Sequence, residues 1–223
     1  MKKIGFITIG QSPRDDIMKD ILPITGDDIQ ILQRGALDNL SEEDLKAITP
    51  KPGDTVLVSS LRNGQSVSMA EEKIIGLLQK CIDELEACGV SGIMFLCTGD
   101  FRELLSSQVP LIYPYRLLTA MIPAICTKKR LTVLVPEEAQ KSAAMAQWEG
   151  IGMHTEVFPI SPYTSTEDDF MTLALTLKKA DCDYILMDCM GYSSNMKTIL
   201  HHYSNKNVLL PRTFAAAVLK ELV

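Results

Sequence analysis

The chain has 223 residues, of which 46% are hydrophobic, and its net charge at pH 7 is −6. This length can bury a sizeable core, as one large domain or as two small lobes. The acidic balance argues against a nucleic-acid partner, because phosphate binding needs a concentrated basic surface. Single arginines could still bind small anions.

The composition also argues against a membrane segment, a metal site and a nucleotide cofactor. No stretch reaches the roughly 18 apolar residues of a membrane helix, and no leader cleavage site follows the N-terminal lysines. The six cysteines form no CxxC pair and have no ligand spacing with the three histidines. Neither GxGxxG nor GxxxxGK occurs. We therefore expect a cytoplasmic protein without metal, cofactor or membrane partner, whose cysteines are mostly reduced.

Residues 4–9 predict a short apolar strand, and a helix is expected to start directly after it. Ser12 suits the N-cap, Pro13 the first helical position, and Asp15 completes a capping box. A helix N-terminus in this place offers free N–H groups to an anion, and Arg14 adds a full positive charge. Arg14 therefore either binds an anionic ligand or pairs with surface acids.

Two further strands are predicted at residues 29–33 and 55–59, with a short helix that opens at Ser41 between them. Arg62 lies in the polar turn after the second of these strands, either as a solvated loop residue or near a ligand at the strand end. Residues 69–88 carry apolar side chains at helical spacing and predict a long helix.

Residues 92–97 predict an apolar strand that ends at Cys97. We expect a helix to start at Asp100, which fits a capping box with Glu103, and a further strand at residues 109–113.

After Pro114 the chain repeats the same alternation of helices and strands. Helices are predicted at residues 115–125, 136–148, 170–177, 193–203 and 212–222, and strands at residues 131–135, 154–158, 184–189 and 207–210.

The repeat predicts an α/β fold of two pseudo-symmetric lobes, each with a mostly parallel sheet flanked by helices. We expect the N-terminal lobe at residues 1–115 and the C-terminal lobe at residues 116–205. The closing strand and helix, residues 206–223, either complete the second lobe or cross back to the first.

Two cysteines occupy matching places in this repeat. Cys97 and Cys189 each end an apolar strand and are followed, after one intervening residue, by Gly99 and Gly191. Ligands of open α/β sheets bind at the carboxyl ends of strands. Backbone N–H groups and a helix dipole could lower the pKa of both thiols there. The alternative, that both are buried packing residues, stays open.

Two thiols on opposing walls could act as an acid/base pair without metal or cofactor. A thiolate would remove a proton from a carbon while a thiol delivers one to the opposite side. The carboxylate of such a substrate would be held by helix N-termini, by the hydroxyls of Ser12 and Thr98, and by Arg14.

Six motifs together resemble the AroM family of bacterial and archaeal proteins, in order and along nearly the whole chain. They are ITIGQSPR near the start, RGALD at 34–38, LRNG at 61–64, FLCTGDF at 95–101, YPYR at 113–116 and LMDCMGYS at 186–193. That family is similar to the aspartate/glutamate/hydantoin racemase superfamily, in which two lobes each offer a cysteine to a cleft. The resemblance implies that Cys97 and Cys189 are the acid/base pair, and that Thr98 and the backbone after each cysteine bind a carboxylate.

Two acids, Asp100 and Asp188, depart from the racemase pattern. Asp188 would raise the pKa of Cys189 unless it is paired. It could be a general base, a partner of Arg14 or Arg62, or a residue on the other face of its strand.

Two functions remain open at this point. The first is a cofactor-independent racemase or isomerase-like enzyme that uses Cys97 and Cys189 on a small carboxylate; related superfamily members also include one-thiol decarboxylases and isomerases. The second is a non-catalytic protein that binds a small anionic metabolite and uses Arg14 and Arg62 without reactive thiols. The resemblance also implies a homodimer as one expected oligomeric state.

Overall fold

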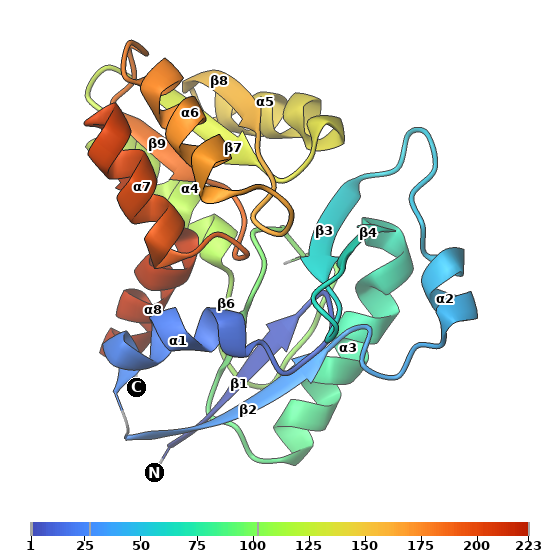
Figure 1. The fold of residues 1–223 in the computed structure, drawn as a ribbon. Helices are drawn as coiled ribbons and strands as arrows, with labels where there is room; N and C mark the ends of the chain where they lie inside the picture. The colour runs from blue at the N-terminus through green and yellow to red at the C-terminus, as the bar shows by residue number, and fades with distance from the viewer. Residues whose placement is uncertain (1, 27, 102, 223) are drawn as a thin grey trace.

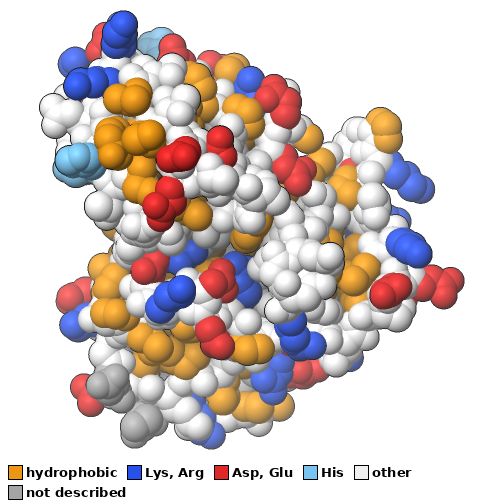
Figure 2. Space-filling model, in the orientation of Figure 1, with side chains coloured by type: hydrophobic (Ala, Val, Ile, Leu, Met, Phe, Trp, Pro, Cys, Tyr) orange, Lys and Arg blue, Asp and Glu red, His pale blue; other side chains and the backbone are white. Residues whose placement is uncertain are grey.

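The computed structural model describes residues 2–26, 28–101 and 103–222, which form two α/β lobes. Figure 1 shows the lobes one above the other, with β1, β2 and α3 in the lower lobe and β7, β8 and α5 in the upper lobe. Acidic and basic side chains are interspersed on the face drawn in Figure 2.

Each lobe contains a four-stranded parallel sheet, and the two sheets have equivalent strand orders. The first sheet has the order β2-β1-β5-β6 and the second the order β8-β7-β9-β10. The strands are β1 (Lys2–Thr8), β2 (Ile29–Gly35), β5 (Ile93–Phe95), β6 (Leu111–Ile112), β7 (Arg130–Val135), β8 (His154–Pro159), β9 (Tyr184–Met187) and β10 (Asn207–Leu209). The predicted fold class is confirmed, and β5 corresponds to β9.

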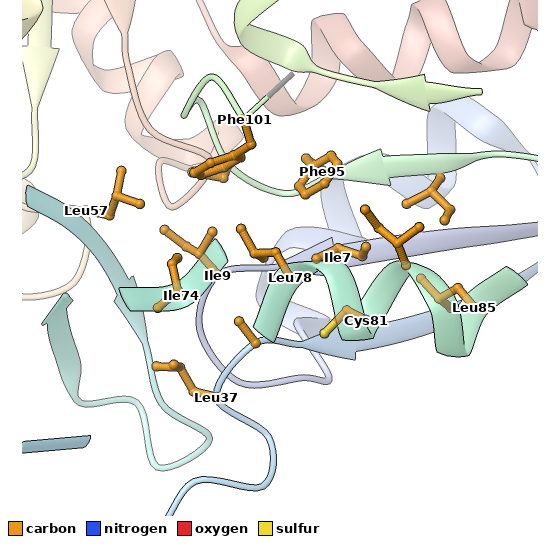
Figure 3. Close-up of a cluster of buried hydrophobic side chains, with 14 of the residues drawn as sticks. Ile7, Ile9, Leu37, Leu57, Ile74, Leu78, Cys81, Leu85, Phe95 and Phe101 are labelled. Atoms are coloured by element: carbon orange, nitrogen blue, oxygen red, sulfur yellow. The ribbon is translucent and has the colours of Figure 1, made fainter. Parts of the chain in front are cut away.

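Helices cover both faces of the first sheet. On one face, α3 (Glu71–Ala87) packs Ile74, Leu78 and Leu85 against β1 and β5, as Figure 3 shows. On the other face lie α1 (Asp15–Thr25) and α8 (Pro211–Leu222). The closing helix thus crosses back to the first lobe, whereas β10 stays in the second sheet. Burial of these aliphatic faces is the main stabilising contribution.

The second sheet is covered in the same way. One face packs against α4 (Pro114–Ile125) and α5 (Lys141–Glu149), where Trp148 is fully buried. The other face packs against α6 (Glu167–Leu177) and α7 (Ser194–Ser204). Successive residues of β9 alternate between the two clusters, because side chains of a strand point to opposite faces.

The prediction for residues 55–59 is only partly correct. This segment is β3 (Val56–Ser60), but it pairs antiparallel with β4 (Ser66–Ala70) as a separate ribbon. The turn between them closes at Gly64, whose φ of 83° favours glycine. The strand at residues 66–70 was not predicted from the sequence.

Two predicted helix starts are wrong. α1 begins at Asp15, because the amide and the hydroxyl of Ser12 bond to Asp38 rather than to the helix; the N-cap residue is Arg14, without a side-chain cap. The described residues between Asp100 and Pro110 contain no helix; residue 102 lies outside them. There Phe101 is buried beside Phe95, at 5.9 Å between ring centroids, and this packing holds the segment as a loop. The short helix α2 (Glu42–Ala47) does start with the capping box of Ser41.

No helix within the described parts of the chain has the length and apolar character that a membrane span requires.

Candidate active site between the lobes

A cavity of about 500 Å³ lies at the carboxyl ends of the central strands, with walls from both lobes. Cys97 and Cys189 both line it, together with Thr98, Gly99 and Gly191. On one side the β3–β4 ribbon reaches the second lobe: Ser68 Oγ donates to Glu137 Oε1 at 2.8 Å, and Gln140 Nε2 donates to the Val56 carbonyl at 3.3 Å. These contacts hold the two walls of the cavity together.

The two thiols occupy equivalent positions in the two lobes. Each cysteine is the second residue after the end of its strand, β5 or β9. The Gly99 N–H donates to Cys97 Sγ at 3.2 Å, and the Gly191 N–H donates to Cys189 Sγ at 3.3 Å. The Cys-x-Gly repeat in the sequence therefore corresponds to a repeated hydrogen bond in the structure.

Glycine is required in both turns by close packing. A Cβ atom on Gly99 would lie 2.5 Å from the Phe101 ring, and one on Gly191 would lie 2.5 Å from the Tyr163 hydroxyl. Tyr163 thereby covers the Cys189 turn, with its hydroxyl 3.8 Å from the sulfur.

The thiol pKa values are raised, contrary to the expectation that the strand-end position lowers them. Burial raises the pKa of Cys97 to about 12, against the opposing effect of the Gly99 N–H. Burial also raises the pKa of Cys189, against the Gly191 N–H, the Tyr163 hydroxyl and the charge of Arg14. The helix dipole contributes little, because α7 begins only at Ser194 and the segment after Cys97 is a loop.

A buried, protonated Cys97 should alkylate slowly. At pH 8 we expect iodoacetamide to modify Cys97 at least roughly 100-fold more slowly in the folded protein than in urea, because little thiolate is present and access is restricted. Peptide mass spectrometry at timed intervals measures both rates. Equal rates for the folded and the unfolded chain would contradict the raised pKa.

Arg14 lies behind the cavity wall. Its Nε and Nη2 donate to the two oxygens of Asp16 at 2.8 and 2.7 Å, and its Nη1 lies 3.3 Å from Ser59 Oγ. The side chain is 3% exposed and borders a second pocket, which it shares with Tyr163. Ser59 and Tyr163 line the cavity and separate Arg14 from it. The positive charge of Arg14 therefore lies near Cys189 without forming part of the cavity lining.

Ser12 and Arg62 are held together by Asp38 and lie outside the cavity lining. The Ser12 hydroxyl donates to Asp38 Oδ2 at 2.6 Å, and Arg62 Nη2 pairs with Asp38 Oδ1 at 2.8 Å. The Arg62 side chain is half exposed and borders the second pocket. The structure therefore does not bring these two predicted ligand-binding residues to the thiols.

Asp188 belongs to the cavity wall beside Cys189. Its backbone carbonyl accepts the Thr98 hydroxyl across the two lobes at 3.3 Å, and its Oδ2 accepts from Trp148 Nε1 at 3.2 Å. Oδ1 is buried without a hydrogen-bond partner among the described residues. Burial raises the pKa of Asp188 to about 6, opposed by the hydrogen bond from Trp148. Neither Arg14 nor Arg62 is its partner.

Asp188→Asn should stabilise the protein at neutral pH. The folded state holds the Asp188 proton more tightly than the unfolded chain does. The stability that this protonated carboxyl contributes is therefore fully present below about pH 4 and is lost as the pH rises through about 6. Asn keeps an oxygen for Trp148 without the buried charge, and we expect about 1–3 kcal/mol more unfolding free energy at pH 7.5. Urea unfolding at pH 4 and 7.5 measures this; an equal effect at both pH values would contradict it.

Three residues of the site were missed in the sequence. Glu71 is the first residue of α3, Tyr163 comes from the loop after β8, and Trp148 is the penultimate residue of α5. None stands in a repeated motif or beside a cysteine, so no local pattern marked them.

The fold is similar to those of solved racemases and isomerases. An aspartate racemase from Picrophilus torridus aligns at 13% identity with a TM-score of 0.59, covering 100% of this chain and 94% of that chain. An allantoin racemase from Klebsiella pneumoniae aligns at 16% identity with a TM-score of 0.68, covering 100% and 87%. The maleate isomerase Iso from Pseudomonas putida S16 aligns at 15% identity with a TM-score of 0.64, covering 99% and 92%. At such identities the likeness shows a shared fold.

Comparison of the sequence with curated proteins finds no match. The model of the family described as AroM protein matches residues 4–223, a range that includes all six motifs quoted above. The chain therefore belongs to the AroM family.

Proposed function

We propose that this protein is a cofactor-independent racemase or isomerase-like enzyme that moves a proton at the carbon next to a small carboxylate. The observation that carries the proposal is the pair of thiols, Cys97 and Cys189, at equivalent strand ends on one cavity with the same N–H donor arrangement. Racemases and an isomerase among the structural neighbours share this fold.

The charges around the thiols favour Cys189 as the first base. The positive charge of Arg14 and the Tyr163 hydroxyl favour a thiolate at Cys189, whereas the negative charge of Glu71 opposes one at Cys97; the charge of Asp188 opposes a thiolate at both sulfurs. In the proposed step Cys189 first loses its proton to solvent; its thiolate then takes the proton from the substrate carbon, and the Cys97 thiol gives its proton to the opposite face. The site then holds a Cys189 thiol and a Cys97 thiolate, so no proton or electron is left over.

The substrate carboxylate is assigned to Thr98 and to the backbone at Gly99 and Gly191. These residues line the cavity beside the sulfurs. In the free protein the Thr98 hydroxyl donates to the Asp188 carbonyl and the two glycine N–H groups donate to the sulfurs, so the carboxylate would replace these acceptors. Hydrogen bonds to the carboxylate would stabilise the negative charge that develops on it when the carbon loses its proton. Arg14 supplies a fixed positive charge from behind the wall and makes no direct ligand contact in this scheme.

Deuterium uptake tests the proposal without knowledge of the natural substrate. Single enantiomers of small carboxylates are incubated with the protein in heavy water, and deuterium at the carbon next to the carboxylate is followed by NMR. We expect at least one compound to exchange at a rate proportional to protein concentration. Absence of protein-dependent exchange across the set would remove the proposal.

The rival function, non-catalytic binding of a small anion, is favoured by one observation. Both thiols are held protonated in the free protein, which a binding protein would tolerate without cost. A ligand that raises the melting temperature without deuterium exchange, by an equal amount in Cys97→Ser and Cys189→Ser, would support this function.

A further inference from the structure

An aromatic ring covers each of the two Cys-x-Gly turns, and the two rings differ by one hydroxyl group. At the first turn, a Cβ atom on Gly99 would lie 2.5 Å from Cζ of Phe101. At the second turn, a Cβ atom on Gly191 would lie 2.7 Å from Cζ of Tyr163 and 2.5 Å from its hydroxyl oxygen. The para end of each ring therefore lies against its glycine, and only the second ring brings an oxygen atom to the turn.

The Tyr163 hydroxyl reaches the sulfur of the thiol beside it. Its oxygen lies 3.8 Å from Cys189 Sγ, which is within hydrogen-bond range for the larger sulfur atom. Burial holds the pKa of Tyr163 well above its ordinary value, so the hydroxyl keeps its proton over the pH range in which thiols ionise. Towards a Cys189 thiolate, which has no proton to give, this hydroxyl is therefore the donor.

Cys97 has no such hydroxyl donor. The fully buried Phe101 packs beside Phe95, so an apolar ring end occupies the place that the hydroxyl has at the second turn. Within the described part of the chain, the hydrogen bond to Cys97 Sγ comes from the Gly99 N–H alone, at 3.2 Å. Two thiols in equivalent backbone positions thus have unequal surroundings.

The loop after β8 holds Tyr163 in place through its own hydrogen bonds. The Tyr163 N–H donates to Ser161 Oγ at 3.2 Å, and Ser161 and Ser165 exchange two bonds at 3.1 and 3.2 Å. Pro162 is buried against the same turn, with its Cγ 2.9 Å from the Cβ position of Gly191. The hydroxyl is therefore in position before any charge forms on the sulfur, and a donor fixed in this way needs no reorganisation.

The other groups around the sulfurs do not account for this difference by direct contact. A glycine N–H donates to each thiol, and the charge of Asp188 opposes a thiolate at both. The charge of Arg14 favours a thiolate at Cys189, but its guanidinium is bonded to Asp16 and lies outside the cavity lining. Tyr163 is the group that contacts Cys189 and has an apolar counterpart at the other thiol.

We propose that Tyr163 is a positioning residue for the proposed reaction: its hydroxyl donates a hydrogen bond to the Cys189 thiolate and thereby makes Cys189 the thiol that ionises first. Phe101 keeps the equivalent place at Cys97 apolar. The consequence for catalysis rests on the proposed function, whereas the hydrogen bond and the order of ionisation do not.

Alkylation of the Tyr163→Phe variant tests the hydrogen bond without a substrate. The variant keeps the ring and removes the one oxygen atom beside the sulfur. Loss of a hydrogen bond to a charged group should slow the modification of Cys189 by iodoacetamide at pH 8 by about 10-fold or more, while Cys97 keeps its rate. A purely steric role of the hydroxyl predicts the opposite sign, because its removal uncovers the sulfur. An unchanged or faster Cys189 rate would overturn the inference.

Tyr115→Phe is the matched control. Tyr115 also lines the cavity and is partly buried, and its hydroxyl bonds to neither sulfur in the described part of the chain. Both cysteines should keep their wild-type alkylation rates in this variant. The ratio of the Cys189 and Cys97 rates within one sample removes any general change in stability. An equal drop of this ratio in both variants would contradict the assignment to Tyr163.

Deuterium exchange in the same variant separates this inference from the proposed function. Slower Cys189 alkylation in Tyr163→Phe, in a protein that exchanges no carboxylate, upholds the inference and counts against catalysis. Exchange by the wild type, together with unchanged Cys189 alkylation in the variant, upholds catalysis and overturns the inference. If both are correct, Tyr163→Phe also slows exchange by about 10-fold, and a higher pH restores part of the rate because it restores the thiolate.

Discussion

Cys97→Ser and Cys189→Ser should each lower the rate of deuterium exchange by about 10³-fold or more. A serine hydroxyl ionises far less readily than a thiol, and a positioned acid or base contributes roughly 10²–10⁴-fold to proton transfer. Serine keeps an acceptor for the Gly99 or Gly191 N–H, so the fold should be retained. Exchange rates by NMR and thermal unfolding by circular dichroism measure the two effects.

Cys182→Ser is the matched control for these variants. Cys182 is only partly buried and lies outside the cavity lining, so exchange should remain at the wild-type rate. Exchange that survives in both Cys97→Ser and Cys189→Ser would exclude thiol acid/base chemistry. Loss in one variant alone would point to a single catalytic thiol.

Arg212→Met should lower the unfolding free energy by about 3–5 kcal/mol, because it removes one partner of a buried charge network. Arg212 is 1% exposed, and its Nε and Nη2 both donate to the Met190 carbonyl, at 2.9 and 2.6 Å. Its Nη1 donates to the Asp16 carbonyl and to Asp20 Oδ2, each at 2.9 Å. The guanidinium thus joins the closing helix to α1 and to the turn after Cys189.

The expected loss corresponds to a melting temperature lower by about 10 °C for a chain of this size. Arg34→Met is the control, because the Arg34–Glu84 pair is partly exposed on both sides and should contribute at most about 1 kcal/mol. Thermal unfolding of both variants decides the comparison. Equal losses of unfolding free energy in the two variants would contradict the larger contribution expected from the buried Arg212.

The architecture was predictable because the two halves repeat one order of aliphatic strands and amphipathic helices. The β3–β4 ribbon was not predicted, because the apolar segment at residues 55–59 does not show which strand pairs with it or in which direction. Its partner at residues 66–70 is short and rich in serine, with little strand signal. At Ser12, the capping pattern competed with a partner 26 residues away, Asp38, which the local sequence could not reveal.

The two thiols were predictable from a local repeat, whereas their surroundings were not. Cys-x-Gly places each sulfur against an N–H two residues on, and this contact is encoded within three residues. Whether Arg14 faces the ligand depends on its ion pair with Asp16, and the roles of Tyr163 and Glu71 depend on how distant elements meet. The burial that raises the thiol pKa values likewise comes from tertiary packing.

The fate of deuterium in a single-enantiomer experiment tests the two-thiol account most directly. One enantiomer of an exchanging carboxylate is incubated in heavy water, and at low conversion deuterium is measured separately in the remaining substrate and in the opposite enantiomer. If Cys189 and Cys97 act from opposite faces, the newly formed enantiomer carries deuterium and the remaining substrate stays largely unlabelled. Equal labelling of both enantiomers would show that one group removes and returns the proton, and would contradict the paired-thiol mechanism.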